Sequence, residues 1–282
     1  SFLKKKVWHL DRHPLNQRAL KEAVKILSSA QKPLIVAGGG VHYSQASETL
    51  RSFAETFSIP VSETQAGKSA MSWKDPMSVG AIGVTGTSTA NLLAKEADVV
   101  LVVGSRLQDF TTASKQVFDA ETKLLHLNIS KFDGLKMDSI MLQADAKSGL
   151  ELLSEELIKV GFQTSTDYKD LIAKLQTEWN TEVDRLYNLK SKEGNVQTSI
   201  VGTLNEFMSP EDVVLCAAGS LPGDLHRLWR SEVPKTYHME YGYSCMGYEV
   251  SGGLGAKMAM EKGEIYVIVG DGSYLMLHSE IL

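Results

Sequence analysis

Residues 264–282 read EIYVIVGDGSYLMLHSEIL, and this stretch decides the fold. Its apolar and β-branched run, residues 265–269, is typical of a buried strand in a parallel sheet. The run ends in Gly270, Asp271, Gly272 and Ser273, and a helix-compatible apolar segment follows. Glycines at a strand end let backbone N–H groups approach an anion, and an aspartate there suits Mg2+. The pattern suggests a diphosphate bound through a metal, although the turn alone fits an ordinary βα turn equally well.

Two more glycine-bearing turns precede this one. An apolar strand over residues 213–218 ends in Gly219-Ser220-Leu221, and residues 251–255, SGGLG, follow a second glycine-rich loop. Each glycine in an exposed helix costs roughly 1 kcal/mol relative to alanine. The cluster therefore makes sense if a helix start must lie against a ligand or another backbone. Open α/β sheets bind ligands at the carboxyl ends of their strands, where all three turns are expected.

The order of these segments resembles the diphosphate-binding domain of thiamine diphosphate (ThDP) enzymes of the acetolactate synthase and pyruvate decarboxylase kind. The segments are GSLP (219–222), YGYSCMGYEVSGGLGAK (241–257) and VGDGSYLM (269–276). Within these enzymes the most similar family is that of the trihydroxycyclohexane-1,2-dione hydrolases of myo-inositol catabolism. The resemblance covers nearly the whole chain, because four earlier segments are similar to that family's middle domain: KPLIVAGGGVHYS (32–44), ETQAGKSA (63–70), GAIGVTGTSTAN (80–91) and ADVVLVVGSRLQDF (97–110).

The resemblance implies a set of cofactor-binding residues. Asp271 matches a Mg2+ ligand, the Ser244 carbonyl matches the acceptor for the aminopyrimidine, and Met246 matches a buried apolar wedge beneath the bent cofactor. Plain core packing is the ordinary interpretation of such a methionine, and the flanking motif favours the wedge. The full set implied for ThDP is Gly219, Ser220, Leu221, Ser244, Met246, Gly270, Asp271, Gly272 and Ser273.

Two parts of the family pattern are not found in these 282 residues. One is an asparagine metal ligand that follows the G-D-G turn. The other is a separate domain, N-terminal to the middle domain, whose glutamate protonates the cofactor. We therefore expect the chain to be a fragment without a catalytic residue of its own, inactive in isolation.

The length and composition limit the classes of protein to which the chain can belong. The length suggests about two domains, and 43% hydrophobic with 22% charged residues is typical of a soluble globular protein. A net charge of −5 argues against nucleic acid or an anionic membrane as the main partner. Two cysteines, Cys216 and Cys245, in apolar or glycine-rich context favour reduced thiols and a cytoplasmic location. Neither a signal peptide nor an apolar run long enough for a membrane span is seen.

Strands alternating with helices predict α/β architecture with a doubly wound, Rossmann-like parallel sheet. The predicted strands of this sheet are residues 33–37, 59–62, 98–103, 123–129 and 140–143. The predicted units are a linker or arm (1–13), a middle domain (14–160), a connecting helix and linker (161–195) and the first part of a ThDP-binding domain (196–282). Residues 80–91 are expected to face a neighbouring domain or subunit rather than a ligand.

Other nucleotide motifs are incomplete. The triplet Gly38-Gly39-Gly40 lacks the third glycine of a dinucleotide fingerprint, since Tyr43 stands there. The glycines favour a tight strand-to-helix crossing, and an adenine nucleotide in this domain is left open. Gly67-Lys68-Ser69 resembles the end of a P-loop, but Ser62 replaces its first glycine. His278 is interpreted as a helix-surface residue rather than one facing substrate.

The leading functional interpretation is part of a ThDP- and Mg2+-dependent hydrolase of carbon–carbon bonds. The resemblance implies an inositol-derived cyclic 1,2-dione as substrate, opened to a 5-deoxy-sugar acid, and a homodimer or homotetramer. Alternatives are another ThDP enzyme (an acetolactate synthase or a 2-oxo acid decarboxylase), an NAD-binding dehydrogenase, and a non-catalytic nucleotide-binding protein.

Overall fold

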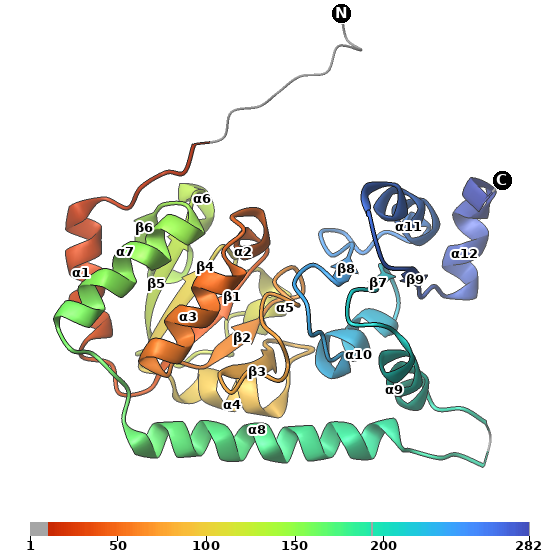
Figure 1. The fold of residues 1–282 in the computed structure, drawn as a ribbon, viewed down its shortest axis with the longest axis horizontal. Helices are drawn as coiled ribbons and strands as arrows, with labels where there is room; N and C mark the ends of the chain where they lie inside the picture. Colours follow the sequence, from red (N-terminus) through yellow and green to blue (C-terminus); the bar gives the residue numbers. More distant parts are fainter. Residues whose placement is uncertain (1–10, 193, 282) are drawn as a thin grey trace, which may run out of the picture.

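The computed structural model describes residues 11–192 and 194–281, and its larger sheet has six parallel strands (Figure 1). The strand order is β3-β2-β1-β4-β5-β6. The strands are β1 (Pro33–Ala37), β2 (Val61–Glu63), β3 (Ser78–Ala81), β4 (Val99–Val103), β5 (Lys123–Asn128) and β6 (Ile140–Gln143). This order is that of a doubly wound nucleotide-binding sheet, with its switch point between β1 and β4. The predicted fold class is therefore confirmed.

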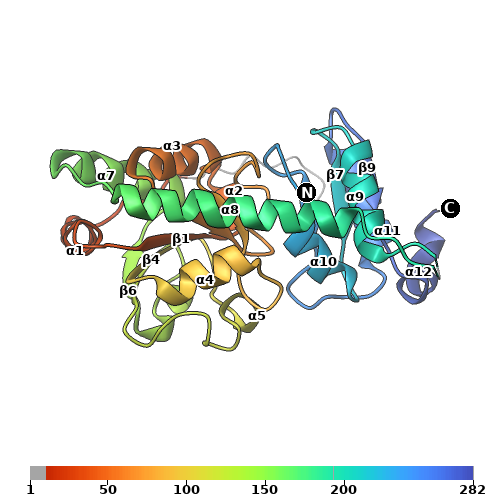
Figure 2. The ribbon, with the colours of Figure 1, turned by 90° about the horizontal axis from the view of Figure 1, so that it is seen from below.

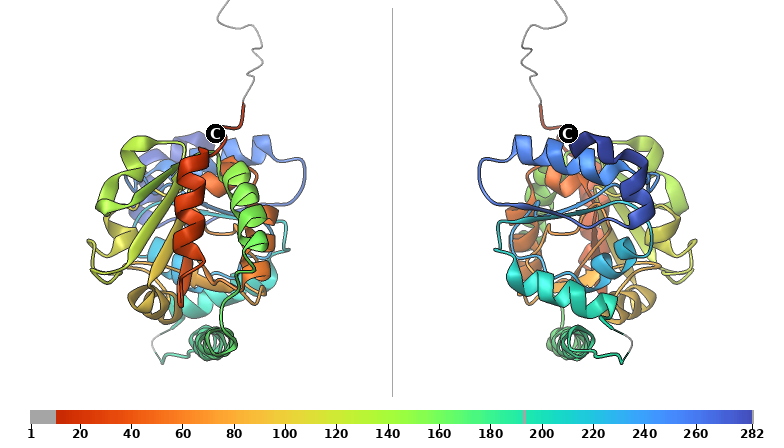
Figure 3. Two further views of the ribbon diagram at one scale, coloured as in Figure 1. Left: turned by 90° about the vertical axis from the view of Figure 1, so that its left-hand side faces the viewer. Right: turned by 90° about the vertical axis from the view of Figure 1, so that its right-hand side faces the viewer.

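Helices cover both faces of this sheet because alternate residues of its central strands point to opposite sides. Ile35 and Ala37 of β1 pack in one core with three helices, α1, α3 and α7, of which α1 and α7 lie side by side in Figure 3. Leu34 and Val36 pack in a second core with α4 and α8. The helices up to this point are α1 (Gln17–Leu27), α2 (Gly40–Tyr43), α3 (Ser47–Phe57), α4 (Ser88–Glu96), α5 (Asp109–Thr112), α6 (Lys131–Gly134), η1 (Lys136–Asp138), α7 (Ala146–Lys159) and α8 (Thr166–Tyr187).

Two strands of the larger sheet differ from the sequence prediction. The strand predicted at residues 59–62 lies at Val61–Glu63. Strand β3 was not predicted, because Ser78–Ala81 is short, pairs with β2 through a register shift and includes Gly80 at φ +79°. Such an edge strand has little apolar pattern to reveal it.

Helix α8 connects the two halves of the chain (Figure 2). Its first part lies against α4 and β3, and its end lies against α9 (Gln197–Phe207). Polar contacts fix it to the larger sheet, since the Gln176 amide donates to the carbonyls of Asp75 and Ser78, each at 2.8 Å. The domain limits stay a prediction, and residues 1–10 of the predicted arm, residue 193 and residue 282 lie outside the described residues.

The second sheet has three parallel strands in the order β8-β7-β9. They are β7 (Val213–Cys216), β8 (Tyr237–Met239) and β9 (Ile265–Val267), and the helices around them are α9, α10 (Leu221–Leu228), α11 (Tyr248–Ala259), α12 (Asp271–Leu277) and η2 (His278–Ile281). The prediction that residues 265–269 form a buried strand is wrong in two respects, its end and its burial, since β9 ends at Val267. Each residue of β9 is only half-buried, because β9 lies at the edge of the described sheet, whereas β7 is buried between its two neighbours.

Polar contacts join the two sheets. The Gln65 amide donates to the Pro222 carbonyl at 2.8 Å and accepts from the Tyr237 hydroxyl at 2.7 Å. His226 Nε2 lies 3.1 Å from the Glu63 carbonyl and Nδ1 lies 2.8 Å from the Thr85 hydroxyl. Since Thr85 belongs to residues 80–91, that segment does face a neighbouring domain, as expected.

No helix in the part of the chain that the structure describes combines the length and apolar character needed to cross a lipid bilayer.

Candidate functional site

The three predicted turns converge at the carboxyl ends of the strands in the smaller sheet. The Ser244 hydroxyl donates to the carbonyl of Ala217, just beyond β7, at 2.9 Å. The amide of Gly247 donates to the Ser273 hydroxyl at 2.7 Å. Segments far apart in sequence are thereby held side by side, and the predicted cofactor residues fall on one edge of the sheet.

Glycines leave backbone groups open at this edge. A Cβ placed on Gly219 or on Gly270 would meet no atom within 4 Å, so both backbones face open space. Gly219 and Gly247 each have φ +91°, a conformation that side chains disfavour. Each turn leads directly into a helix, α10, α11 or α12, and the positive end of a helix dipole favours an anion. These features fit a diphosphate group.

Asp271 lies exposed at the start of α12, and its Oδ1 accepts from the Gly272 amide at 2.8 Å. Within the described residues, no three His, Cys, Asp or Glu side chains gather to hold a metal ion. A Mg2+ ion at Asp271 would take further oxygen ligands from other groups, such as a bound phosphate group and water, as Mg2+ commonly does.

Met246 departs from the prediction of a buried wedge, because its side chain is 49% exposed. Its Cε would lie 3.5 Å from a Cβ on Gly272, so the methionine does flank the G-D-G turn. The loop that carries it lies outside the sheet and is fixed by Glu240, whose carboxylate accepts from the amides of Tyr243 (3.2 Å) and Cys245 (2.6 Å).

The remaining predicted cofactor residues would act mainly through their backbone groups. Ser220 is exposed, whereas Leu221 packs against the hydrophobic core beneath the smaller sheet, so its side chain points away from the open edge. The Ser273 side chain is buried and points inward. His278 is exposed in η2, in agreement with its interpretation as a surface residue.

Sequence reasoning missed Glu249, the second residue of α11. Its side chain is fully buried, and its carboxylate accepts from Ala218, Gly247 and Ser273, one donor from each turn. A single acidic residue within the apolar and glycine-rich run MGYEVSGGLG was the available signal. Lys, Glu, Arg and Asp are almost never fully buried unless they are paired.

A separate cavity of about 830 Å3 lies at the carboxyl ends of β1, β4 and β5. A Cβ on Gly38 would lie 2.5 Å from the Gly104 carbonyl oxygen, and one on Gly40 would lie 2.6 Å from the Gly104 Cα. These glycines therefore allow close approach of two turns, in agreement with the prediction of a tight crossing, and the amides of Gly38 and Gly40 already donate to the carbonyls of Val103 and Gly104.

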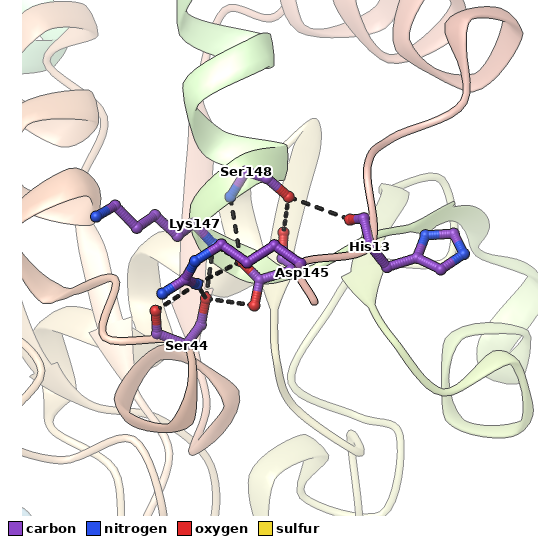
Figure 4. Close-up of polar contacts among 6 residues, drawn as sticks. His13, Ser44, Asp145, Lys147 and Ser148 are labelled. Atoms are coloured by element: carbon purple, nitrogen blue, oxygen red, sulfur yellow. Dashed lines mark hydrogen bonds and ion pairs between the residues drawn. The ribbon is translucent and has the colours of Figure 1, made fainter. Parts of the chain in front are cut away.

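One wall of this cavity is a polar cluster around Asp145 (Figure 4). Arg12 Nη1 donates to Asp145 at 2.7 Å and to the Ser44 hydroxyl at 2.9 Å, and Ser148 donates to the His13 carbonyl at 3.1 Å. Burial disfavours the charged form of Asp145, but the hydrogen bonds from Ser44 and Arg12 lower its pKa below the usual range. The cluster fixes the segment before α1 onto α7.

Comparison with known proteins agrees with this division of the chain. Residues 20–153 match the thiamine pyrophosphate enzyme central domain, and residues 217–282 match the thiamine pyrophosphate enzyme C-terminal TPP binding domain. Thiamine pyrophosphate (TPP) is another name for ThDP.

Curated relatives match the whole chain. The 3D-(3,5/4)-trihydroxycyclohexane-1,2-dione hydrolase of Clostridium tetani is 45% identical, with 100% of this chain and 47% of that protein covered. The proteins of the same name from Bacillus cereus (strain AH820) and Bacillus anthracis (strain CDC 684 / NRRL 3495) show the same identity and coverage. The chain thus spans about half the length of these relatives. The two domain matches and the fold together show that the chain belongs to the thiamine pyrophosphate enzymes.

Proposed function

We propose that this chain is part of a ThDP- and Mg2+-dependent hydrolase that opens an inositol-derived cyclic 1,2-dione. The observation that carries the proposal is the convergence of three glycine-bearing turns beside Asp271, two of them open at Gly219 and Gly270. The 45% identity over the whole chain to proteins named as hydrolases of such a dione supports the choice of substrate.

The proposed tasks of the residues follow from their positions. The backbones of Gly219 and Gly270 receive the diphosphate, because they face open space in front of α10 and α12, and Gly272 within the first turn of α12 receives it with them. Asp271 holds Mg2+ together with diphosphate oxygens and water. Ser220, Leu221 and Ser273 shape the turns, and Ser244 and Met246 support the rings of the cofactor. When bound, ThDP supplies a carbon nucleophile and an electron sink next to a carbonyl group.

The proposed reaction adds one water molecule across the bond between the two carbonyl carbons of the ring. That bond breaks, one carbon gains the hydroxyl and becomes a carboxylic acid, and the other gains hydrogen and becomes an aldehyde. The product is an open-chain 5-deoxy-sugar acid. The remaining parts of the active site, the asparagine and glutamate implied by the family pattern, are proposed to lie elsewhere in the whole protein. A homodimer or homotetramer and a cytoplasmic location stay predictions.

Another ThDP enzyme, such as an acetolactate synthase or a 2-oxo acid decarboxylase, is the second candidate, since the same cofactor site would serve it. A dehydrogenase is disfavoured because the amides of Gly38 and Gly40 donate to the carbonyls of Val103 and Gly104 and are not free to bind a phosphate.

The test uses the protein at the length of its curated relatives, incubated with ThDP and Mg2+ and offered either the dione or pyruvate. We expect the mass of the dione to increase by one water molecule, only when ThDP is present. Carbon dioxide or acetolactate from pyruvate, with an unchanged dione, would overturn the substrate and retain the cofactor. Inactivity on both compounds would contradict the proposal.

A further inference from the structure

We propose that Glu249 is the positioning residue of the cofactor site: its buried carboxylate holds the three glycine-bearing turns in the arrangement that receives the diphosphate and its metal. This inference rests on the proposed function, because it assigns Glu249 a task within ThDP binding. It goes further than the proposed function because it names a residue that makes no contact with the cofactor and still determines how tightly the protein binds it.

The geometry ties one carboxylate to three separate turns. Glu249 Oε1 accepts from the Ala218 amide, just after β7, at 3.2 Å. Its Oε2 accepts from the Gly247 amide at 3.1 Å and from the Ser273 hydroxyl at 2.6 Å. The Ser273 hydroxyl in turn accepts from the Gly247 amide at 2.7 Å, which closes the network. Every turn of the site is thereby connected to the others through a single side chain.

The chemistry of this position demands a carboxylate. Three donors converge on it, and an ionised carboxylate offers acceptors only, whereas a glutamine would direct its NH2 group at one of these donors. The side chain is 0% exposed, and among the described residues no lysine, arginine or histidine forms a salt bridge with it. Its charge is instead compensated by the three donors and by the N-terminus of α11, where Glu249 is the second residue.

The bonded groups adjoin the predicted cofactor residues, and Ser273 is one of them. Ala218 precedes Gly219, Gly247 follows Met246, and Ser273 follows Gly272. Any displacement of the carboxylate therefore shifts the backbone that faces the diphosphate. Groups that orient metal-binding residues from behind affect metal affinity by about 10- to 100-fold when they are substituted.

The same sheet offers a matched control at its opposite end. Asp212 is also a buried carboxylate, 8% exposed, and it accepts from the amides of Ser209 (2.9 Å) and Glu264 (2.8 Å). It joins the segments that enter β7 and β9, at the amino ends of these strands. Asp212 thus holds the same sheet together without contact to the three turns.

The experiment compares Glu249→Gln with Asp212→Asn in the protein at the length of its relatives. Calorimetry measures the Kd of ThDP at saturating Mg2+ and the Kd of Mg2+ at saturating ThDP, below the unfolding temperature of each variant. We expect Glu249→Gln to weaken both by about 10- to 100-fold. Asp212→Asn is expected to lower the unfolding temperature and leave both constants unchanged. Ser273→Ala removes one donor and is expected to give a smaller loss in the same direction.

The outcomes separate this inference from the proposed function. If Glu249→Gln binds ThDP and Mg2+ as tightly as the wild type, or if Asp212→Asn loses as much affinity as Glu249→Gln, the positioning role is overturned. The proposal that the protein binds ThDP is unaffected by either result. If Glu249→Gln does not fold, Ser273→Ala decides the question, and an unchanged Kd there would overturn the inference. A wild-type protein that binds no ThDP would overturn the proposed function and this inference with it.

Discussion

Three side chains of the site differ in solvent exposure, and this exposure determines whether a substitution mainly tests cofactor binding or the folded arrangement of the site. Asp271 lies at the surface, Met246 is 49% exposed and Glu249 is fully buried. Asp271 was predictable because its signal is local, an acid between two glycines after an apolar run. The role of Glu249 was not, because its partners Ala218 and Ser273 lie 31 and 24 residues away in sequence and no local pattern records such contacts.

Asp271→Asn is expected to weaken Mg2+-dependent ThDP binding by about a hundredfold, because the amide cannot neutralise the cation. The asparagine oxygen can still accept from the Gly272 amide, so the turn should be retained. Calorimetric titration with and without Mg2+ measures the effect, and Glu280→Gln, an exposed acid in η2, serves as control. Equal ThDP affinity in Asp271→Asn and wild type would exclude Asp271 as a metal ligand.

Met246→Ala is expected to lower turnover by about 10- to 100-fold while ThDP is still bound, because the rings of the cofactor lose their support. Half-exposure limits the loss of folding stability to about 1 kcal/mol. Steady-state kinetics and chemical denaturation separate the two effects. Unchanged turnover would show that Met246 only packs at the surface and does not support the rings of the cofactor.

At the scale of elements, the glycines of α11 have different tasks. The sequence suggested only that the helix lies against a ligand or another backbone. In the structure, a Cβ on Gly253 would overlap Cγ2 of Val267 in β9, whereas a Cβ on Gly255 would meet nothing within 4 Å. Gly253 therefore sets the distance between helix and strand, and Gly255 does not.

Gly253→Ala and Gly255→Ala form a matched pair within this one helix. The first is expected to destabilise the chain by about 1–3 kcal/mol through overpacking against Val267. The second should stabilise it by about 0.5–1 kcal/mol, because alanine loses less entropy on folding. Urea denaturation of this chain compares them, and destabilisation of equal size by both would contradict the assigned packing.

The success of sequence prediction differed between elements for physical reasons. Strands β1 and β4 were located to within one residue, because central parallel strands are continuous apolar runs. Strand β3 was missed, because a short edge strand containing Gly80 lacks that pattern. The burial of β9 was overstated, because apolar composition does not tell an edge strand from a central one.

At the scale of the whole molecule, a neutral histidine joins the two sheets. Burial lowers the pKa of the His226 imidazole to about 3. A carbonyl only accepts, so Nε2 donates to the Glu63 carbonyl and Nδ1 accepts from the Thr85 hydroxyl. Protonation of Nδ1 would reverse the hydrogen bond with the Thr85 hydroxyl, which would then accept, and would place an extra charge between the sheets.

This contact predicts a loss of stability in acid. The pKa of His226 in the unfolded chain is about 6.5. Below this pH the unfolded chain binds a proton at His226 and the folded chain does not, so the free energy of unfolding falls as the pH falls toward 3. We expect His226 to contribute a loss of about 2 kcal/mol between pH 8 and pH 5. His226→Gln should flatten the pH dependence of the unfolding free energy, measured by urea denaturation. Identical slopes in both proteins would contradict a neutral His226.

The most direct test of the account is a structure of the protein, at the length of its relatives, determined with ThDP and Mg2+. We predict Mg2+ at about 2.1 Å from an Asp271 carboxylate oxygen, and the diphosphate against the backbones of Gly219 and Gly272. Cofactor bound instead in the cavity at the carboxyl ends of β1 and β4, with Asp271 left in water, would contradict the site derived from the three turns.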